Sequence, residues 1–189
     1  MKEGKYAMFL TELPPDDAIA ALLPEYTPEG DATRVLCTDG STFLYPRTLR
    51  ATLQAVARRR CKDLSLLRRW AAGYTHRTLN NPIAASADLV LAPVKARRPR
   101  IPGDETMAAV NVAARPAPRL DAEEDEGRRP RRGAKPGDAV IRLAGGSSVA
   151  SLWSEKTTLA HLAAARGISS ELIRAEEEAV LRRLAAKER

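Results

Sequence analysis

Residues 33–45 read TRVLCTDGSTFLY, and this stretch is the clearest indication of fold in the 189-residue chain. Two short apolar runs, Thr33–Thr38 and Thr42–Tyr45, flank the dipeptide Asp39-Gly40. Asp-Gly tolerates the positive φ angles of a tight turn, and short apolar runs on either side of such a turn are typical of strands. The stretch therefore predicts a β-hairpin around which the rest of the chain can be arranged.

Other short apolar segments predict the remaining strands of a small antiparallel sheet. We expect strands at Tyr6–Leu10, Leu89–Leu91 and Thr106–Val112, whereas Ala18–Leu23 is Ala/Leu-rich and fits either a strand or a helix. Pro93 is expected to end the strand at Leu89–Leu91, because proline has no N–H to donate to a neighbouring strand.

After Pro46 the apolar residues change to a helical period. The first predicted helix has its apolar positions at Leu49, Leu53, Val56 and Ala57. A second helix is predicted over about Asp63–Ala72, with Gly73 as its stop and with Leu64, Leu67 and Trp70 holding it to the core. A proline-containing connector at Leu79–Ala85 follows. The expected fold class is α+β: a small antiparallel sheet with a basic helical pair and a helical C-terminus.

Residues 115–138 differ in composition from the rest of the chain. They contain four prolines, an acidic run at Asp121–Glu126 and a basic run at Arg128–Lys135, with almost no large apolar residue. Such a segment cannot bury enough apolar surface to offset the entropy lost on ordering. We therefore expect a disordered linker or long loop that separates an N-terminal α+β DNA-binding region, residues 1–114, from a C-terminal region, residues 139–189.

The C-terminal region predicts a final hairpin, around Gly145-Gly146, and then two helices, at about Ser154–Arg166 and Ser169–Lys187. The junction of these helices resembles a helix-turn-helix, in which Gly167 makes the turn, Ser169 or Ser170 caps the second helix, and Ser170 and Arg174 lie on its exposed face. The three consecutive acids Glu176–Glu178 make that face poorly suited to the major groove. Packing, dimerisation or docking of a partner is therefore favoured over DNA reading by this helix.

Positive charge is concentrated in one part of the chain. The formal net charge is +7, and residues 45–103 contain 13 Lys or Arg against two Asp, so that segment carries +11 and the remainder −4. Concentrated positive charge attracts a polyanion at long range. The sequence therefore predicts nucleic acid, and double-stranded DNA in particular, as the partner.

Three groups of arginines carry this prediction. Two groups lie on the predicted helices, and the third lies in the loop Lys95–Gly103, which Pro99 and Pro102 stiffen. Guanidinium groups bind phosphates bidentately and also fit an A·T minor groove. We expect one continuous cationic surface, in which phosphate and minor-groove contacts are made by Arg58, Arg59, Arg60, Arg97, Arg98 and Arg100, with Arg68 and Arg69 adding to the positive field.

Signals for other classes of function are weak. His76 and His161 have no evident carboxylate or nucleophile partner, and Gly145-Gly146-Ser147-Ser148 lacks the Gly-Lys-Ser/Thr ending of a phosphate loop. Two cysteines are too few for a disulfide framework, and no apolar stretch reaches signal-peptide or membrane-spanning length. We expect a non-enzymatic, cytoplasmic protein with no membrane contact, no metal and no cofactor.

Several short motifs occur in the order found in the competence transcription factor (ComK) family, which the chain resembles over roughly residues 18–165. The motifs are Ala20-Ala21-Leu22-Leu23-Pro24-Glu25, Thr33-Arg34-Val35 with the Asp-Gly hairpin, Leu49 through Arg60-Cys61-Lys62, Leu79-Asn80-Asn81-Pro82-Ile83, Leu89-Val90-Leu91-Ala92-Pro93 with Arg98-Pro99, and Val140-Ile141-Arg142-Leu143 with Gly145-Gly146. The sequence departs from the family at Ala92 and Val94, which replace a Phe and a Thr, and lacks the family's Cys and Trp after Arg-Pro.

The resemblance implies a nucleoid-associated transcription activator of DNA-uptake genes. It implies binding to A·T-rich duplex largely through the minor groove, as a homo-oligomer of one or two dimers, and a C-terminal region that an adaptor-protease system handles. Two alternatives stay open from the residues themselves: an RNA-associated basic protein, and a protein-interaction module with Ser154–Lys187 as its docking element. The low aromatic content, 4%, argues against platforms that stack single-stranded bases.

Overall fold

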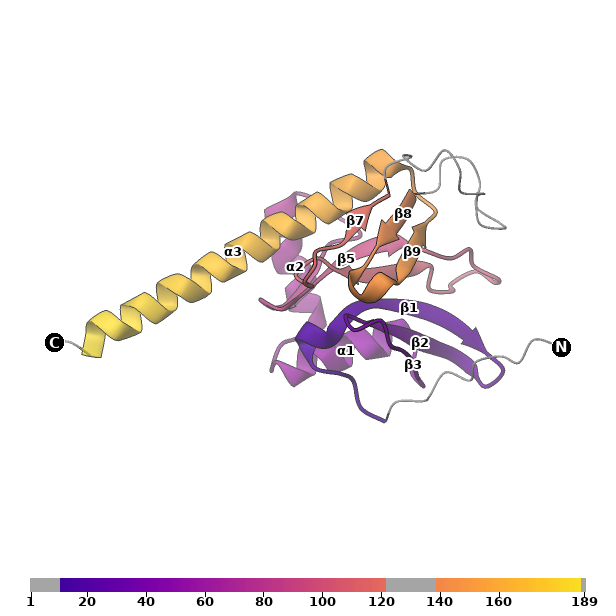
Figure 1. The fold of residues 1–189 in the computed structure, drawn as a ribbon, viewed down its shortest axis with the longest axis horizontal. Helices are drawn as coiled ribbons and strands as arrows, with labels where there is room; N and C mark the ends of the chain where they lie inside the picture. The colour runs from indigo at the N-terminus through magenta and orange to yellow at the C-terminus, as the bar shows by residue number, and fades with distance from the viewer. Residues whose placement is uncertain (1–10, 122–138, 188–189) are drawn as a thin grey trace.

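A computed structural model describes residues 11–121 and 139–187. Its main element is a six-stranded antiparallel sheet with the strand order β3-β2-β1-β6-β5-β4 (Figure 1). These strands are β1 (Ile19–Thr27), β2 (Gly30–Cys37), β3 (Thr42–Tyr45), β4 (Ile83–Ser86), β5 (Leu89–Lys95) and β6 (Met107–Asn111). The predicted α+β class is therefore confirmed.

The sheet consists of two three-stranded meanders joined by a helical pair. Strands β1–β3 form the first meander and β4–β6 the second, and the two meet at the centre of the sheet, where β1 pairs with β6. The chain passes from one meander to the other through α1 (Leu49–Arg59) and α2 (Leu64–Thr75). The predicted hairpin at 33–45 is present as β2 and β3, with Thr33 opposite Tyr45.

A second, three-stranded sheet has the order β7-β8-β9, formed by β7 (Arg119–Leu120), β8 (Ala139–Arg142) and β9 (Ser148–Ser151). It is followed by one long helix, α3 (Glu155–Lys187), whose first half crosses the six-stranded sheet and whose second half projects from the body (Figure 1).

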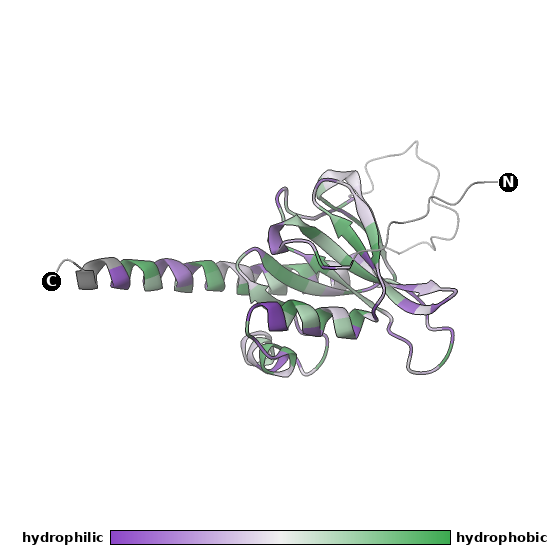
Figure 2. Ribbon diagram, turned by 90° about the horizontal axis from the view of Figure 1, so that it is seen from below, coloured by the Kyte–Doolittle hydropathy of each residue, from purple (hydrophilic) through white to green (hydrophobic). Residues whose placement is uncertain are grey.

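Both faces of the six-stranded sheet are covered, because successive strand residues point to opposite sides. Along β5, Leu89 and Leu91 join the cluster beneath α1, whereas Val90 and Ala92 join the cluster beneath α3. In Figure 2 the strands of the body carry most of the hydrophobic colouring. A strand buried on both faces appears in sequence as a continuous apolar run, as this one does.

Several expectations for individual elements need correction. Residues 18–23 lie mostly in a strand, β1, and the predicted connector at Leu79–Ala85 contains the start of β4. Strand β5 does not end at Pro93, because Pro93 lies past the residue opposite the start of β4, where β5 pairs with β6 alone. On α2, Leu64 is buried, but Trp70 is 44% exposed and does not hold the helix to the core.

The predicted linker is also partly wrong. Arg119–Leu120 forms β7, and the Asp121 N–H donates to the Val140 carbonyl at 2.9 Å. The remainder of the expected linker, residues 122–138, and the predicted strand at Tyr6–Leu10 lie outside the described residues. The regions on either side of the linker are not separate cores, because Val94 and Ala108 share one cluster with Ile141 and Ile168.

The predicted helix-turn-helix is absent, since α3 runs unbroken through Gly167. A Cβ at Gly167 would lie 3.3 Å from Oη of Tyr74, so this glycine provides room for α2 against α3 and makes no turn. The Ser170 hydroxyl does not cap a helix but donates to the Arg166 carbonyl within the same helix, at 3.1 Å. Arg174 pairs with Glu171 on the helix surface.

The two sheets touch at a pair of glycines. Gly40 in the β2–β3 turn and Gly145 in the β8–β9 turn both have positive φ, and a Cβ on Gly145 would lie 2.1 Å from the Gly40 nitrogen. No side chain fits there, so the contact fixes the small sheet against the predicted hairpin.

Replacing Gly145 with alanine is expected to destabilise the protein by about 3 kcal/mol or more, because a left-handed backbone and a clash with main-chain atoms act together. Gly146→Ala is the matched control: Gly146 also has positive φ, but a Cβ added there would meet no atom within 4 Å beyond its chain neighbours. Its loss should stay near 1 kcal/mol. Urea denaturation measures both, and equal losses would contradict the proposed contact.

Candidate nucleic-acid interface

The predicted arginines form two groups rather than one surface. The helix group (Arg58, Arg59, Arg60, Arg68 and Arg69) lies on or beside α1 and α2, and the loop group (Arg97, Arg98 and Arg100) lies in the β5–β6 loop. Arg59 contacts Asp16, just before β1, whereas Arg100 contacts Tyr26, near the end of β1. The strand between those contacts extends over roughly 20 Å, at about 3.3 Å per residue. The structure therefore places the predicted arginines in two separate groups and not in one cluster.

Arg59 and Arg60 are held by the buried carboxylate of Asp16. Both guanidinium groups contact it, with Arg60 Nε at 2.7 Å from Oδ2, and the Ser86 hydroxyl donates to the same oxygen at 2.7 Å. Burial raises the pKa of Asp16, but the hydrogen bonds from Ser86 and Arg60 and the charge of Arg59 outweigh it and hold the pKa below 3.8. The pairing of Asp16 with these groups therefore stabilises the folded state near neutral pH, and this stabilisation is lost as acid protonates Asp16.

The loop group is held mainly by Tyr26. The guanidinium carbons of Arg97 and Arg100 lie 3.8 and 3.9 Å from the centroid of its ring, so one guanidinium must cover each face. The Tyr26 hydroxyl donates to Asp104, and Arg97 also donates to the Glu105 carbonyl at 2.5 Å. These contacts fix the loop to the tip of the β1–β2 hairpin.

Arg98 is the exception within the loop group. It is exposed and makes no ion pair or hydrogen bond to any residue in the described ranges. Arg97 and Arg100 therefore shape the loop, and Arg98 is its available cation.

A tight turn brings the two basic helices together. At the end of α1 the N–H of Cys61 donates to Arg58 and the N–H of Lys62 donates to Ala57, each at 2.9 Å, and Cys61 has φ of 53°. This is a Schellman motif with cysteine in the left-handed position. The Asp63 carboxylate then caps α2, accepting the Ser65 and Leu66 N–H groups at 2.9 Å. The turn is therefore fixed at both ends.

Four cations surround a depression of about 70 Å³ between the helices. Arg50 and Arg58 come from α1, Lys62 from the turn and Arg68 from α2. Within the described part of the chain, none of the three arginine side chains makes an ion pair or a hydrogen bond. We call this set, Arg50, Arg58, Lys62 and Arg68, the basic surface.

Sequence reasoning did not include Arg50 and Lys62 among the site residues. Residues four apart lie on the same side of a helix, so the series Arg50, Gln54 and Arg58 could have identified one polar stripe on α1. Lys62 carries no such periodic signal, because it lies in the turn. Its ammonium group also donates to the Ala85 carbonyl at 2.9 Å.

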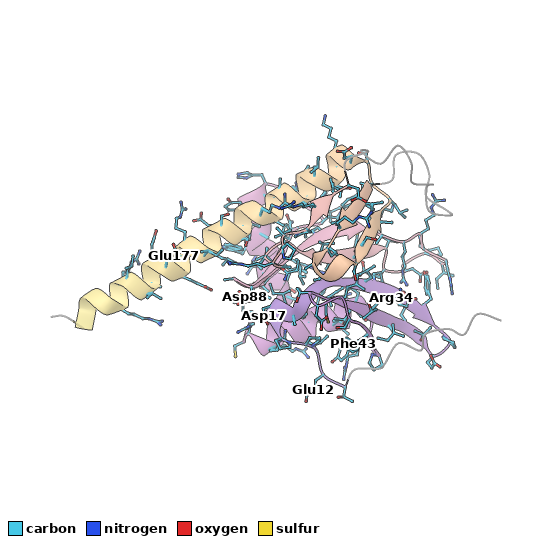
Figure 3. The ribbon with its side chains drawn as sticks, viewed as in Figure 1. Glu12, Asp17, Arg34, Phe43, Asp88 and Glu177 are labelled. Carbon is cyan, nitrogen blue, oxygen red and sulfur yellow. The ribbon has the colours of Figure 1, made fainter. Side chains whose placement is uncertain are left out.

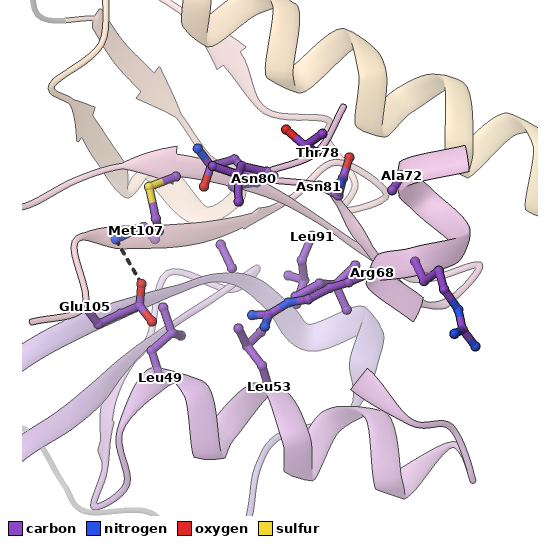
Figure 4. Close-up of a pocket in the computed structure, with 16 residues that line it drawn as sticks. Leu49, Leu53, Arg68, Ala72, Thr78, Asn80, Asn81, Leu91, Glu105 and Met107 are labelled. Carbon is purple, nitrogen blue, oxygen red and sulfur yellow. Dashed lines mark hydrogen bonds between the residues drawn. The ribbon is translucent and has the colours of Figure 1, made fainter. Parts of the chain in front are cut away.

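A larger hollow of about 400 Å³ lies between the helical pair and the second meander (Figure 4). Its walls include Leu49 and Leu53 from α1 and Leu91 from β5, and the Arg68 side chain reaches toward Leu53. Arg68 thus borders both the hollow and the depression. Arg68 and Arg69 line the hollow against Glu105, for a formal charge of +1 among mostly uncharged residues, whereas four cations and one acid line the depression. The basic surface is therefore the better candidate for a polyanion.

Other chemical groups are engaged in packing. The ring of His161 stacks on Trp153 with centroids 4.4 Å apart, and its Nδ1 lies 3.1 Å from Arg77 Nη1. Burial and the charge of Arg77 lower the pKa of His161 to about 4. Over residues 11–121 and 139–187, no group of three or more His, Cys, Asp or Glu could hold a metal ion. No helix in those ranges is long and apolar enough to cross a membrane.

Asp16→Asn tests the structural assignment of Arg59 and Arg60. We expect a loss of about 2 kcal/mol in the free energy of unfolding, because two guanidinium groups lose their counter-charge, one of them 32% and the other 45% exposed. Asp17→Asn is the control, since Asp17 is an exposed neighbour (Figure 3). Urea denaturation at pH 7 should separate the variants, and a loss below about 0.5 kcal/mol for Asp16→Asn would show that the pairing does little.

Comparison with known proteins gives no match to this chain among family models, curated proteins or solved structures.

Proposed function

We propose that the protein binds double-stranded DNA through the basic surface between α1 and α2. The observation that carries this proposal is the convergence of Arg50, Arg58 and Arg68 on one depression without a carboxylate partner in the described residues. Arginines that serve only solubility spread over a surface or pair with acids, and these three do neither.

The electrostatics of the depression favour phosphate. The four cations and the single acid that border it, Asp63, give a formal charge of +3. Oδ1 of Asp63 accepts two N–H groups of α2, and within the described residues the Asp63 carboxylate forms no ion pair with the guanidinium groups. The guanidinium group of an arginine on a helix can donate two parallel hydrogen bonds to two oxygens of one phosphate. Release of counterions from the DNA would add to the free energy of binding.

Activation of transcription is the second part of the proposal, and it rests on the resemblance to the competence transcription factor family. In this proposal the basic surface grips the phosphate backbone, and Arg98 in the stiff β5–β6 loop enters an A·T-rich minor groove. Arg59, Arg60, Arg97 and Arg100 stabilise the elements that carry these contacts. The regulated genes would be those for DNA uptake.

Binding of single-stranded nucleic acid is the second candidate, because α2 exposes two aromatic rings beside its arginines. Trp70 and Tyr74 are 44% and 45% exposed and lie one helical turn apart. Aromatic rings next to cations can stack unpaired bases. Duplex and single-stranded oligonucleotides of equal length and sequence therefore need to be compared, and tighter binding to the duplex is expected.

The triple variant Arg50→Gln/Arg58→Gln/Arg68→Gln tests the main proposal. Fluorescence anisotropy with an A·T-rich duplex at several salt concentrations gives the slope of log K against log salt. We expect the slope to fall by about 0.9 for each lost phosphate contact, a total of roughly 2.7, with weaker binding at low salt.

Arg119→Gln/Arg174→Gln/Arg182→Gln is the matched control, because it removes three charges from exposed positions on β7 and α3. Its slope should stay within about one contact of the unmodified protein. Identical slopes for the two triple variants would reject the basic surface as the interface. Tighter binding to single strands, lost in Trp70→Ala, would favour the second candidate.

A further inference from the structure

The second half of α3 projects from the body without packing against it (Figures 1 and 2). The first half of the helix contributes Leu162, Ala165 and Ile168 to the core. Every residue from Ile173 to Arg183 is exposed, and the apolar residues among them include Val180 at 52% and Leu181 at 65%. Most of the stability of a helix in a protein comes from packing against other elements, and helix propensity adds little. Residues 173–183 of α3 have no such packing against the described residues.

Charge along the projecting half is segregated by sign. After Arg174, which pairs with Glu171, the acids Glu176, Glu177 and Glu178 come next, and Arg182 and Arg183 follow one turn later. Glu177 is seen on the outer part of α3, away from the sheets (Figure 3). A parallel copy would set acid against acid and base against base, whereas an antiparallel copy sets each acidic run against a basic one.

One side of the helix combines these charges with the exposed apolar residues. At about 100° per residue, Ile173 lies roughly 20° from Val180 around the axis, and Glu176 and Arg183 lie roughly 40° and 60° from Val180 on one edge of the same face. Glu178 and Arg182 lie on the opposite side, where they pair with each other at 3.3 Å. The Val180 side therefore combines exposed apolar surface with two opposite charges that have no partner among the described residues.

We propose that two copies of this chain associate through the projecting halves of α3, antiparallel, with the twofold axis at Val180. The twofold axis brings the same edge of both helices together, so it places Arg183 beside the partner's Glu176 and Glu176 beside the partner's Arg183. The midpoint of the acidic and basic runs falls at the same position as the exposed valine, so charge and apolar surface give the same register. Flanking charge pairs of this kind set orientation in paired helices.

The contact is small, so the dimer is weak and depends on protein concentration. An overlap of residues 173–187 extends over about 22 Å at 1.5 Å per residue. Such an overlap lies at the lower end of specific interfaces in area. It involves neither the basic surface nor DNA, and it stands or fails independently of the proposed function.

Charge reversal tests both the contact and its direction. Glu176→Arg and Arg183→Glu should each weaken self-association of the full chain about tenfold, because two symmetric attractions become repulsions. An equimolar mixture of the two variants should associate at least as tightly as the unmodified protein, since both pairs are then complementary. Sedimentation velocity over a range of concentrations measures each case.

Glu178→Arg and Arg182→Glu are the matched controls on the opposite side of the helix, and they should leave association unchanged within about twofold. Val180→Glu should abolish it, while circular dichroism reports whether α3 remains helical in each variant. The proposal is overturned if the unmodified protein stays monomeric at every concentration, if the mixture fails to associate, or if the controls weaken association as much as the test variants.

Discussion

The buried amide of Asn111 joins the two halves of the fold. The meanders meet through only two residue pairs between β1 and β6, Ala21 with Val110 and Leu22 with Ala109. Beside this short ladder, the Asn111 amide nitrogen donates to the carbonyls of Ile19 and Asp88 at 2.8 and 2.9 Å. Its oxygen accepts the N–H groups of Val90 and Ala113 at 3.1 and 3.0 Å. All its hydrogen-bonding capacity is thus used, and a buried amide is stabilising only when this is so.

Dependence on residues that are distant in sequence, as at Asn111, separates the features that the sequence predicts from those that it does not. Hairpin 33–45 and helices α1 and α2 follow from patterns within a dozen residues, so the sequence predicts them well. The sequence predicts a strand β5 that is too short. Whether Pro93 interrupts the strand depends on where the neighbouring strand β4 begins, which no local pattern gives. The predicted turn at Gly167 is wrong, because α3 continues through this glycine and packs there beside Tyr74, a residue far away in sequence.

The candidate site shows the same limit. Charge content located the basic segment of the chain, but which of its arginines remain unpaired depends on tertiary partners. Asp16 lies 43 residues before Arg59, and Tyr26 lies 74 residues before Arg100, so no local pattern marks those arginines as engaged. The alignment of Arg50 with Arg58 is local, and helical periodicity alone could have predicted it.

The run Arg58-Arg59-Arg60 shows how engaged and available arginines depend on one another. Consecutive residues on a helix point about 100° apart, so three neighbours cannot serve one surface. Here Arg59 and Arg60 turn toward Asp16 and tie the end of α1 to the residues just before β1, while Arg58 borders the depression shared with α2. Arg59 and Arg60 thereby fix the end of α1, and this end carries the unpaired Arg58. An arginine-rich sequence can therefore supply both the frame and the contact surface of one interface.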